Sequence, residues 1–155
     1  MTNQEKIAFK IKLKHFGLEM LSLRIRTART AMDRAQEAAN AEEKSSSGDK
    51  YETGRAMGQL EKEMYGRQMV EYEKELKALQ SITADSICLQ GGPGAFIRGS
   101  GIAFYVSAGL GKQQVGKLTV LFISPFAPLA RSLQGKKPGD SILFNGASFV
   151  IEEVY

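Results

Sequence analysis

The spacing of apolar residues in the first half of the chain constrains its fold more than any other feature. Between residues 18 and 39, apolar or small side chains recur at alternating steps of three and four positions, as in the seam of an antiparallel coiled coil. A second stretch, after residue 56, repeats this spacing with a slip near Arg67. The predicted seam residues are Ile7, Ile11, Leu18, Leu21, Ile25, Ala28, Met32, Ala35 and Ala39, followed by Met57, Leu60, Met64, Met69, Tyr72, Leu76 and Leu79. We therefore predict two long helices joined by a short polar turn, an αα-hairpin.

The residues of this hairpin become smaller toward its turn. The seam holds Leu, Ile and Met at the base, and small residues near the turn: Ala35, Ala38 and Ala39 on the first helix and Gly54, Ala56 and Gly58 on the second. Small residues either let the helix axes approach closely or mark a poorly packed end, and the sequence leaves both open. A first helix from about Gln4 to about Glu43 would be on the order of 60 Å long.

The composition changes sharply near Ile82, where charged residues become rarer and Gly, Val, Ile and Phe more frequent. We predict an α+β protein with a helical hairpin over residues 1–81 and a small, mostly antiparallel β domain over residues 82–155. The predicted strands are 86–89, 102–106, 118–123, 141–144 and 149–154, with one short helix at 129–134.

The formal net charge of +4 is unevenly distributed along the hairpin. Residues 1–34 hold eight Lys or Arg against three acids, whereas residues 35–53 hold two against five. A general nucleic-acid binder would usually carry positive charge on its contacting end. The acidic end instead suggests a metal ion, a basic protein surface or a catalytic centre as its target, although solvated helix faces can have the same composition.

Two carboxylates, Asp49 and Glu52, lie in the predicted turn, residues 45–53, which we call the tip. Asp49 as N-cap and Glu52 as third helical residue would satisfy free N–H groups at the start of the second helix, and capping alone explains both residues. The same carboxylates could also supply oxygen ligands to Mg²⁺, which commonly takes only one or two from a protein. Such a site would be incomplete on this chain and would need ligands from a partner.

Other classes of site find little support in the sequence. Cys88 is the only cysteine, which excludes an intrachain disulfide and is consistent with a reducing compartment; its simplest role is that of a small apolar strand residue. His15 is the only histidine, so no catalytic triad or zinc set can be assembled. The sequence has neither an apolar run of membrane-spanning length nor a signal peptide, and we expect a cytoplasmic protein.

The tip sequence Gly48-Asp49-Lys50-Tyr51-Glu52-Thr53 is similar to Gly-Asp-Leu-Ser-Glu-Asn, the tip motif of the Gre transcription-cleavage factors (GreA and GreB) of bacterial RNA polymerase. The segment from Pro128 to Asp140 matches that family's Pro-Leu-Gly-Arg-Ala-Leu-Leu-Gly-Lys-Lys-Val-Gly-Asp without a gap. Residues 149–155 resemble its final strand. The resemblance covers nearly the whole chain, with its three matches in the right order.

The resemblance implies a coiled coil with an acidic tip and an FKBP-like C-terminal domain. The coiled coil would enter the secondary channel of RNA polymerase, where Asp49 and Glu52 help to hold a Mg²⁺ jointly with the polymerase. Cleavage near the 3′ end of a backtracked transcript would follow, with the polymerase as the enzyme and this chain as an accessory factor. A turn comprising Gly135, Lys136, Lys137 and Asp140 is a candidate contact with the channel rim, although a purely structural turn is the simpler explanation.

Two other functions remain open at the level of sequence. Lys50 and Tyr51 stand where the family has Leu and Ser, which suggests a regulator that occupies the channel without stimulating cleavage. The third possibility is a coiled-coil interaction module unrelated to polymerase, with the tip acids acting only as caps. We expect a monomer in each case.

Overall fold

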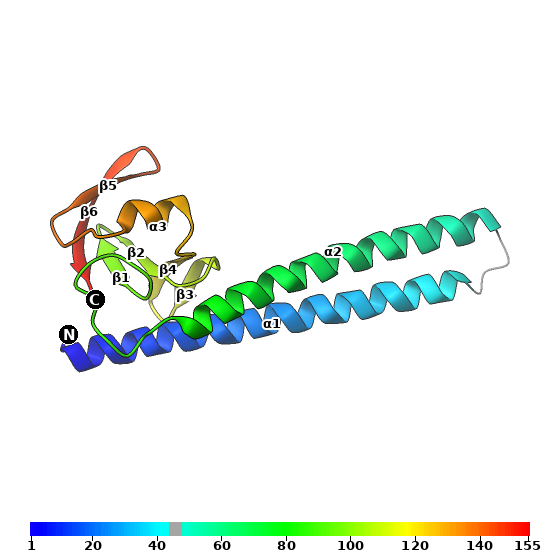
Figure 1. The fold of residues 1–155 in the computed structure, drawn as a ribbon, viewed down its shortest axis with the longest axis horizontal. Coiled ribbons are helices and arrows are strands. Elements are labelled where there is room, and N and C mark those ends of the chain that lie inside the picture. Colours follow the sequence, from blue (N-terminus) through cyan, green and yellow to red (C-terminus); the bar gives the residue numbers. More distant parts are fainter. Residues whose placement is uncertain (44–47) are drawn as a thin grey trace. The chain divides into compact units, whose positions relative to one another are not determined.

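A computed structural model describes residues 1–43 and 48–155, with side chains for 1–41 and 52–155. Helix α1 spans Asn3–Glu43 and helix α2 spans Gly48–Ser81, and the two run antiparallel (Figure 1). The predicted hairpin and the limits of its first helix are therefore confirmed. Residues 44–47, which include part of the predicted tip, lie outside the described residues.

The buried face of α2 differs from the predicted seam in its distal half. Met57 and Leu60 are 57% and 66% exposed, and Met64 is also exposed, so these three seam predictions are wrong. The residues at steps of four and three running back from Leu79 are buried or half-buried instead: Leu76, Tyr72, Met69, Tyr65, Lys62 and Gly58. The spacing thus continues without the predicted slip near Arg67. On α1, Leu21, Ile25, Ala28 and Ala35 are buried as predicted, whereas Ile11 is exposed.

Small residues bring the two helices close together in the distal half of the hairpin. A Cβ atom placed on Gly58 would lie 2.8 Å from the Cβ of Ala39 and 3.3 Å from the carbonyl oxygen of Ala35. The Nζ of Lys62 donates a hydrogen bond of 2.8 Å to Oε1 of Gln36, one turn farther along this face. Of the two interpretations left open by the sequence, close approach of the helices is the one observed.

The rest of the chain forms one six-stranded sheet and a short helix. The strands are β1 (Phe96–Gly99), β2 (Ile102–Val106), β3 (Gly111–Val115), β4 (Leu118–Ile123), β5 (Ser141–Phe144) and β6 (Ala147–Val154), and helix α3 spans Pro128–Leu133. Their order is β3-β4-β2-β1-β6-β5. All neighbours are antiparallel except β2 and β4, which are parallel. The predicted α+β class and mostly antiparallel sheet are confirmed.

Two strands were missed and one predicted strand is absent. Strands β2, β4 and β5 have the predicted limits, and β6 begins two residues earlier than predicted. Strand β1 lies in a glycine-rich segment, and the edge strand β3, Gly-Lys-Gln-Gln-Val, lacks an apolar run. Residues 86–89 form a loop instead of a strand, so the strand role proposed for Cys88 is also wrong. In this loop the carbonyl oxygen of Ser86 accepts a hydrogen bond from the side chain of Lys10.

The contacts divide the chain into two compact units, one comprising residues 1–19 and 75–155, which we call the sheet unit, and the other residues 20–74, the helical unit. In the sheet unit, the first turns of α1 pack on the sheet through Leu13, which is fully buried, and through Phe9 and Phe16. The ring centroids of Phe9 and Phe96 are 5.3 Å apart, and those of Phe16 and Phe122 are 5.8 Å apart. The predicted division between residues 81 and 82 marks the change from helix to sheet, and as a boundary between domains it stays a prediction.

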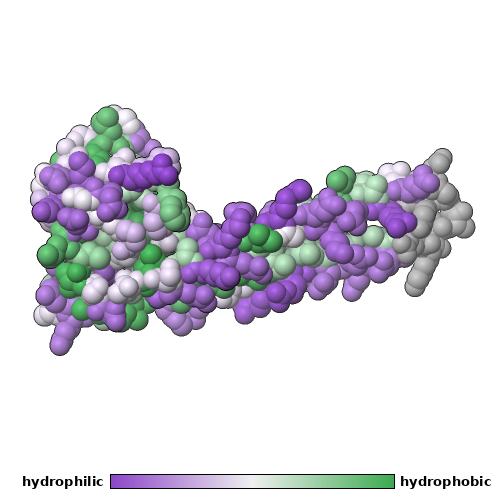
Figure 2. Space-filling view, in the orientation of Figure 1, coloured by the Kyte–Doolittle hydropathy of each residue, from purple (hydrophilic) through white to green (hydrophobic). Residues whose placement is uncertain are grey.

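The apolar core of the sheet unit lies around Phe104, which contacts Phe144 and Phe149 at centroid distances of 5.3 and 5.2 Å. Ala130 and Leu133 of α3 are buried in the same core. The helical unit, in contrast, is mainly hydrophilic on the face seen in Figure 2. None of the helices, over the residues that the structure describes, is long and apolar enough to cross a bilayer.

Candidate functional site

The first turns of α2 carry the two predicted site residues. The helix begins at Gly48, one residue before Asp49, so Asp49 lies in the first turn instead of at the predicted N-cap position. Positions 49 and 52 are three residues apart on this helix and therefore lie on the same face. The side chain of Asp49 is outside the described part of the chain, whereas the side chain of Glu52 is exposed to solvent.

Glu52 lines an open hollow on the surface of α2. The hollow has a volume of about 450 Å³, and its other lining residues are Arg55, Ala56 and Gln59. Among the side chains described, no three His, Cys, Asp or Glu residues come together to hold a metal ion. Glu52 therefore offers a single accessible carboxylate with hard oxygen donors, the ligand type that Mg²⁺ prefers. A Mg²⁺ site here would require Asp49, a partner, or both.

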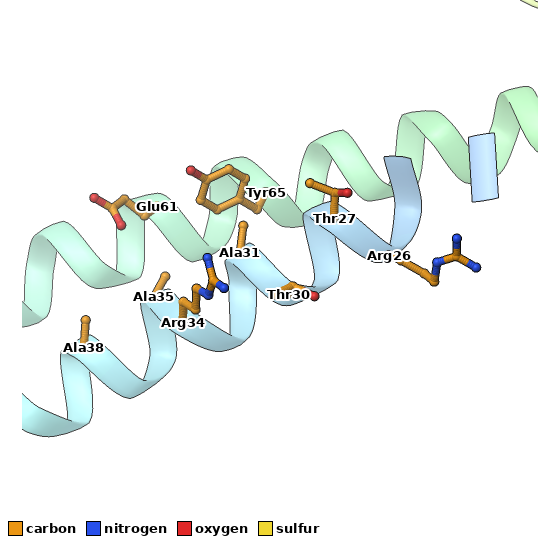
Figure 3. Close-up of a pocket in the computed structure, with 9 residues that line it drawn as sticks. All are labelled: Arg26, Thr27, Thr30, Ala31, Arg34, Ala35, Ala38, Glu61 and Tyr65. Atoms are coloured by element: carbon orange, nitrogen blue, oxygen red, sulfur yellow. The ribbon is translucent and has the colours of Figure 1, made fainter. Parts of the chain in front are cut away.

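A larger groove of about 690 Å³ lies between the two helices of the helical unit (Figure 3). The short side chains of Ala31, Ala35 and Ala38 on α1 leave space along its floor, and Tyr65 and Glu61 of α2 stand across from them. The other lining residues are Arg26, Thr27, Thr30 and Arg34. The groove thus combines two guanidinium groups, hydroxyl groups and one carboxylate, and it can interact with polar or charged partners.

Sequence analysis did not identify this groove. Arg26, Thr30 and Arg34 are spaced at steps of four, which places them on one face of α1, and this spacing is visible in the sequence. The position of the groove was not predictable, because it depends on Tyr65 facing α1, whereas the apolar pattern had placed Met64 there.

The predicted contact turn, residues 135–140, joins α3 to β5 and is held by hydrogen bonds on both sides. The N–H of Gly139 donates to the carbonyl oxygen of Ile151 at 2.8 Å, and the N–H of Gly135 donates to that of Gly91 at 2.9 Å. The carboxylate of Asp140 accepts a 2.8 Å hydrogen bond from the N–H of Lys137. Gly139 has φ +95°, a conformation that favours glycine. These interactions explain Gly135, Gly139 and Asp140 by the structure of the turn alone.

The two lysines of the turn are not explained in this way. Lys137 is exposed and Lys136 half-buried, and neither side chain forms an ion pair with the described residues. The turn therefore presents two positive charges on a rigid backbone. Glu52 belongs to the other compact unit.

Comparison of the chain with protein-family models, with curated proteins and with solved structures gave no match.

Proposed function

We propose that this protein is a Gre-type elongation factor of bacterial RNA polymerase that stimulates cleavage of backtracked transcripts from the secondary channel. The single observation that carries the proposal is the closely packed hairpin, in which positions 49 and 52 lie on one face of α2, one and four residues after its first residue, Gly48. A paired helix end with small interhelical residues is suited to a narrow channel. The motif resemblance at the tip gives the two carboxylates their role.

In this proposal the chain acts by donating ligands to the active centre of the polymerase. Asp49 and Glu52 would bind a Mg²⁺ jointly with polymerase residues, and their carboxylates would orient the attacking water. When bound, the ion supplies Lewis-acid activation of that water and of the scissile phosphate. Glu52 fits this role because its side chain is exposed to solvent. The chain itself would not be an enzyme.

The sheet unit would dock at the channel rim. An FKBP-like arrangement of its C-terminal part is supported by the mostly antiparallel sheet and the short helix α3, and it belongs to the proposal. Lys136 and Lys137 are the residues of the turn that are free to contact an acidic surface, since Gly135 and Asp140 serve the turn itself. A cytoplasmic location and a monomeric state are part of the same proposal.

The decisive experiment separates binding from cleavage. In the double variant Asp49→Asn/Glu52→Gln, shape and most hydrogen-bonding capacity are kept, but both negative charges that a divalent ion requires are removed. We expect this variant to bind core RNA polymerase as the unchanged protein does and to lose stimulation of Mg²⁺-dependent cleavage in stalled, backtracked complexes. Binding is measured by co-migration with the polymerase and cleavage by the release of short 3′ RNA fragments.

A matched control removes the same amount of charge elsewhere on α2. Glu63 and Glu73 are exposed, and the variant Glu63→Gln/Glu73→Gln should retain stimulation. Unchanged cleavage with Asp49→Asn/Glu52→Gln would refute the role of the two carboxylates. If the unchanged protein binds polymerase without stimulating cleavage, and Lys50→Leu/Tyr51→Ser gains the activity, the protein is a channel-binding regulator. Failure to bind polymerase would leave a coiled-coil module with another partner.

A further inference from the structure

Lys10 of α1 is fully buried, which is unusual for a lysine and calls for a specific partner. Its Nζ donates a hydrogen bond of 2.8 Å to the carbonyl oxygen of Ser86 and contacts Sγ of Cys88 at 3.6 Å. No carboxylate forms an ion pair with Lys10 in the described part of the chain. The buried amine is thus held directly against the only thiol of the protein.

Cys88 lies in the loop between α2 and β1, and the residue is half-buried. Strand β2 carries a further buried polar group, Tyr105. The hydroxyl of Tyr105 is buried and has no hydrogen-bond partner among the described atoms. Its pKa is raised, mainly by burial and secondly by the charge of Cys88.

We propose that Lys10 and Cys88 form an oxidation site at which peroxide links the two side chains through a sulfur–nitrogen bond. The thiol first gives two electrons to hydrogen peroxide, which yields a sulfenic acid and one water. Nζ of Lys10 then forms a bond to the sulfur while the sulfur–oxygen bond breaks, and the hydroxyl leaves with an N–H proton as a second water. The product is a sulfenamide, and the linked chain is two hydrogens lighter than the reduced chain.

The position of Lys10 favours this reaction over the other reactions of a sulfenic acid. Sulfenic acids condense with a nearby thiol or nitrogen, or else are oxidised further. The chain has no second cysteine, so Lys10 Nζ at 3.6 Å is the nucleophile already in contact with the sulfur.

The link would fasten the start of α1 to the loop that follows α2, over a sequence separation of 78 residues. Both segments belong to the sheet unit. The bond would therefore stabilise this unit by reducing the number of conformations open to the unfolded chain. Excess small thiol would reverse it, because two thiols reduce the sulfur–nitrogen bond to the original amine and thiol and are oxidised to a disulfide. The site would therefore respond reversibly to peroxide.

Peptide mapping of the intact protein after treatment with hydrogen peroxide tests the proposal. Trypsin does not cleave after a substituted lysine, so we expect residues 7–12 joined to residues 78–98, with the mass of the two peptides less two hydrogens. The joined peptide should disappear after reduction with dithiothreitol. The midpoint of thermal unfolding should rise on peroxide treatment and return on reduction.

Lys14 provides a matched control, since it lies one turn along α1 and its Nζ also donates to backbone carbonyl oxygens, at 3.1 Å to Gln80 and 2.6 Å to Ile82. Lys14→Met should retain the joined peptide, whereas Lys10→Met and Cys88→Ser should lose it. In Lys10→Met we expect Cys88 to proceed to sulfinic acid. Sulfinic or sulfonic acid in the unchanged protein without the joined peptide, or a thiol that resists peroxide, would overturn the proposal. These outcomes do not depend on polymerase binding.

Discussion

At the scale of single residues, Glu153 is the best-defined charged centre of the sheet unit. Its carboxylate is 2.9 Å from Nζ of Lys6 and 3.2 Å from a guanidinium nitrogen of Arg98. Lys6 also lies over the ring of Tyr155, 5.1 Å from the centroid. The hydrogen bond from Lys6, with further contributions from Arg98, lowers the pKa of Glu153 below its usual value of 4.5. Glu153 thereby joins the first turn of α1 to β1 and β6.

This lowered pKa predicts how stability depends on pH. A carboxyl group whose pKa is lower in the folded state stabilises the fold above its unfolded pKa and loses that contribution as pH falls through the folded value. Glu153→Gln should therefore lower the free energy of unfolding at neutral pH by about 1 kcal/mol, the scale of a partly exposed ion pair. The difference from the unchanged protein should shrink below about pH 4.5, the usual value for this group.

Urea denaturation at several pH values measures this effect. Glu152 is the control, because its carboxylate pairs with Arg98 alone among the described residues, at 3.1 Å, and is more exposed than that of Glu153. Glu152→Gln should cost less than Glu153→Gln. Equal losses for the two variants, or a Glu153→Gln deficit that persists in acid, would contradict the assignment of this stabilisation to the Lys6–Glu153–Arg98 cluster.

At the scale of elements, the close approach of α1 and α2 depends on one glycine. Gly58 is buried and its missing Cβ would lie 2.8 Å from the Cβ of Ala39. Because backbone and a short side chain form this contact, neither neighbour can rotate away. A larger residue at position 58 must therefore displace one helix from the other.

We expect Gly58→Leu to destabilise the hairpin by about 1 to 3 kcal/mol, the usual cost of overpacking. Ala56→Leu, at an exposed position two residues earlier, should change stability little. Thermal unfolding followed by helical circular dichroism compares the two variants. A Gly58→Leu protein as stable as Ala56→Leu would show that the helices do not need this spacing.

The same glycine shows why only part of the hairpin was predictable. Both helices and the limits of α1 followed from a long apolar pattern, which needs no partner to be recognised. The pattern failed in the distal half of α2, because Met57, Leu60 and Met64 are the apolar residues there, while Gly58, Lys62 and Tyr65 face α1. Hydrophobicity identifies a buried face only where large side chains fill the interface. Where helices touch through small residues, apolar side chains can remain in solvent.

In the sheet, too, only part of the structure could be predicted from the sequence. Strands β2, β4 and β5 are apolar enough to be predicted, whereas β3, at one edge of the sheet, is polar. Residues 86–89 have the composition of a strand but lack a strand partner, and their loop is held by Lys10 from a segment 76 residues away. At the tip, sequence analysis identified Asp49 and Glu52. Whether their carboxylates act together remains a prediction, since only Glu52 has a described side chain.

At the scale of the whole molecule, the sheet unit includes the first 19 residues of the chain. Phe9, Leu13 and Phe16 of α1 pack on it; Leu13 is fully buried, and complete burial of such a side chain is worth roughly 1.5 to 3 kcal/mol. A fragment that begins at residue 82 would lose these contacts and expose Phe96 and Phe122. The helical unit, in contrast, makes its own contacts between α1 and α2.

We therefore expect a chain in which a flexible Gly/Ser linker replaces residues 20–74 to fold, and the isolated fragment 82–155 to be much less stable. Cooperative thermal unfolding and resistance to protease report folding of each, and binding of a dye to exposed apolar surface reports its loss. If fragment 82–155 is as stable as the linked chain, the first turns of α1 are not part of the folded unit.

The order of strands in the sheet also has a consequence for synthesis of the chain on the ribosome. Strand β1 pairs with two strands, β2 and β6. Strand β2 follows β1 immediately in the sequence, whereas Glu153 of β6 is 55 residues beyond Arg98 of β1. The edge of β1 that pairs with β6 therefore stays unpaired until most of the sheet has been translated. The helical unit pairs residues that are much closer in sequence, as in the 26-residue separation of Gln36 and Lys62, and can assemble while translation continues. A nascent chain would thus complete its hairpin first and leave β1 open to a chaperone or to aggregation until β6 emerges.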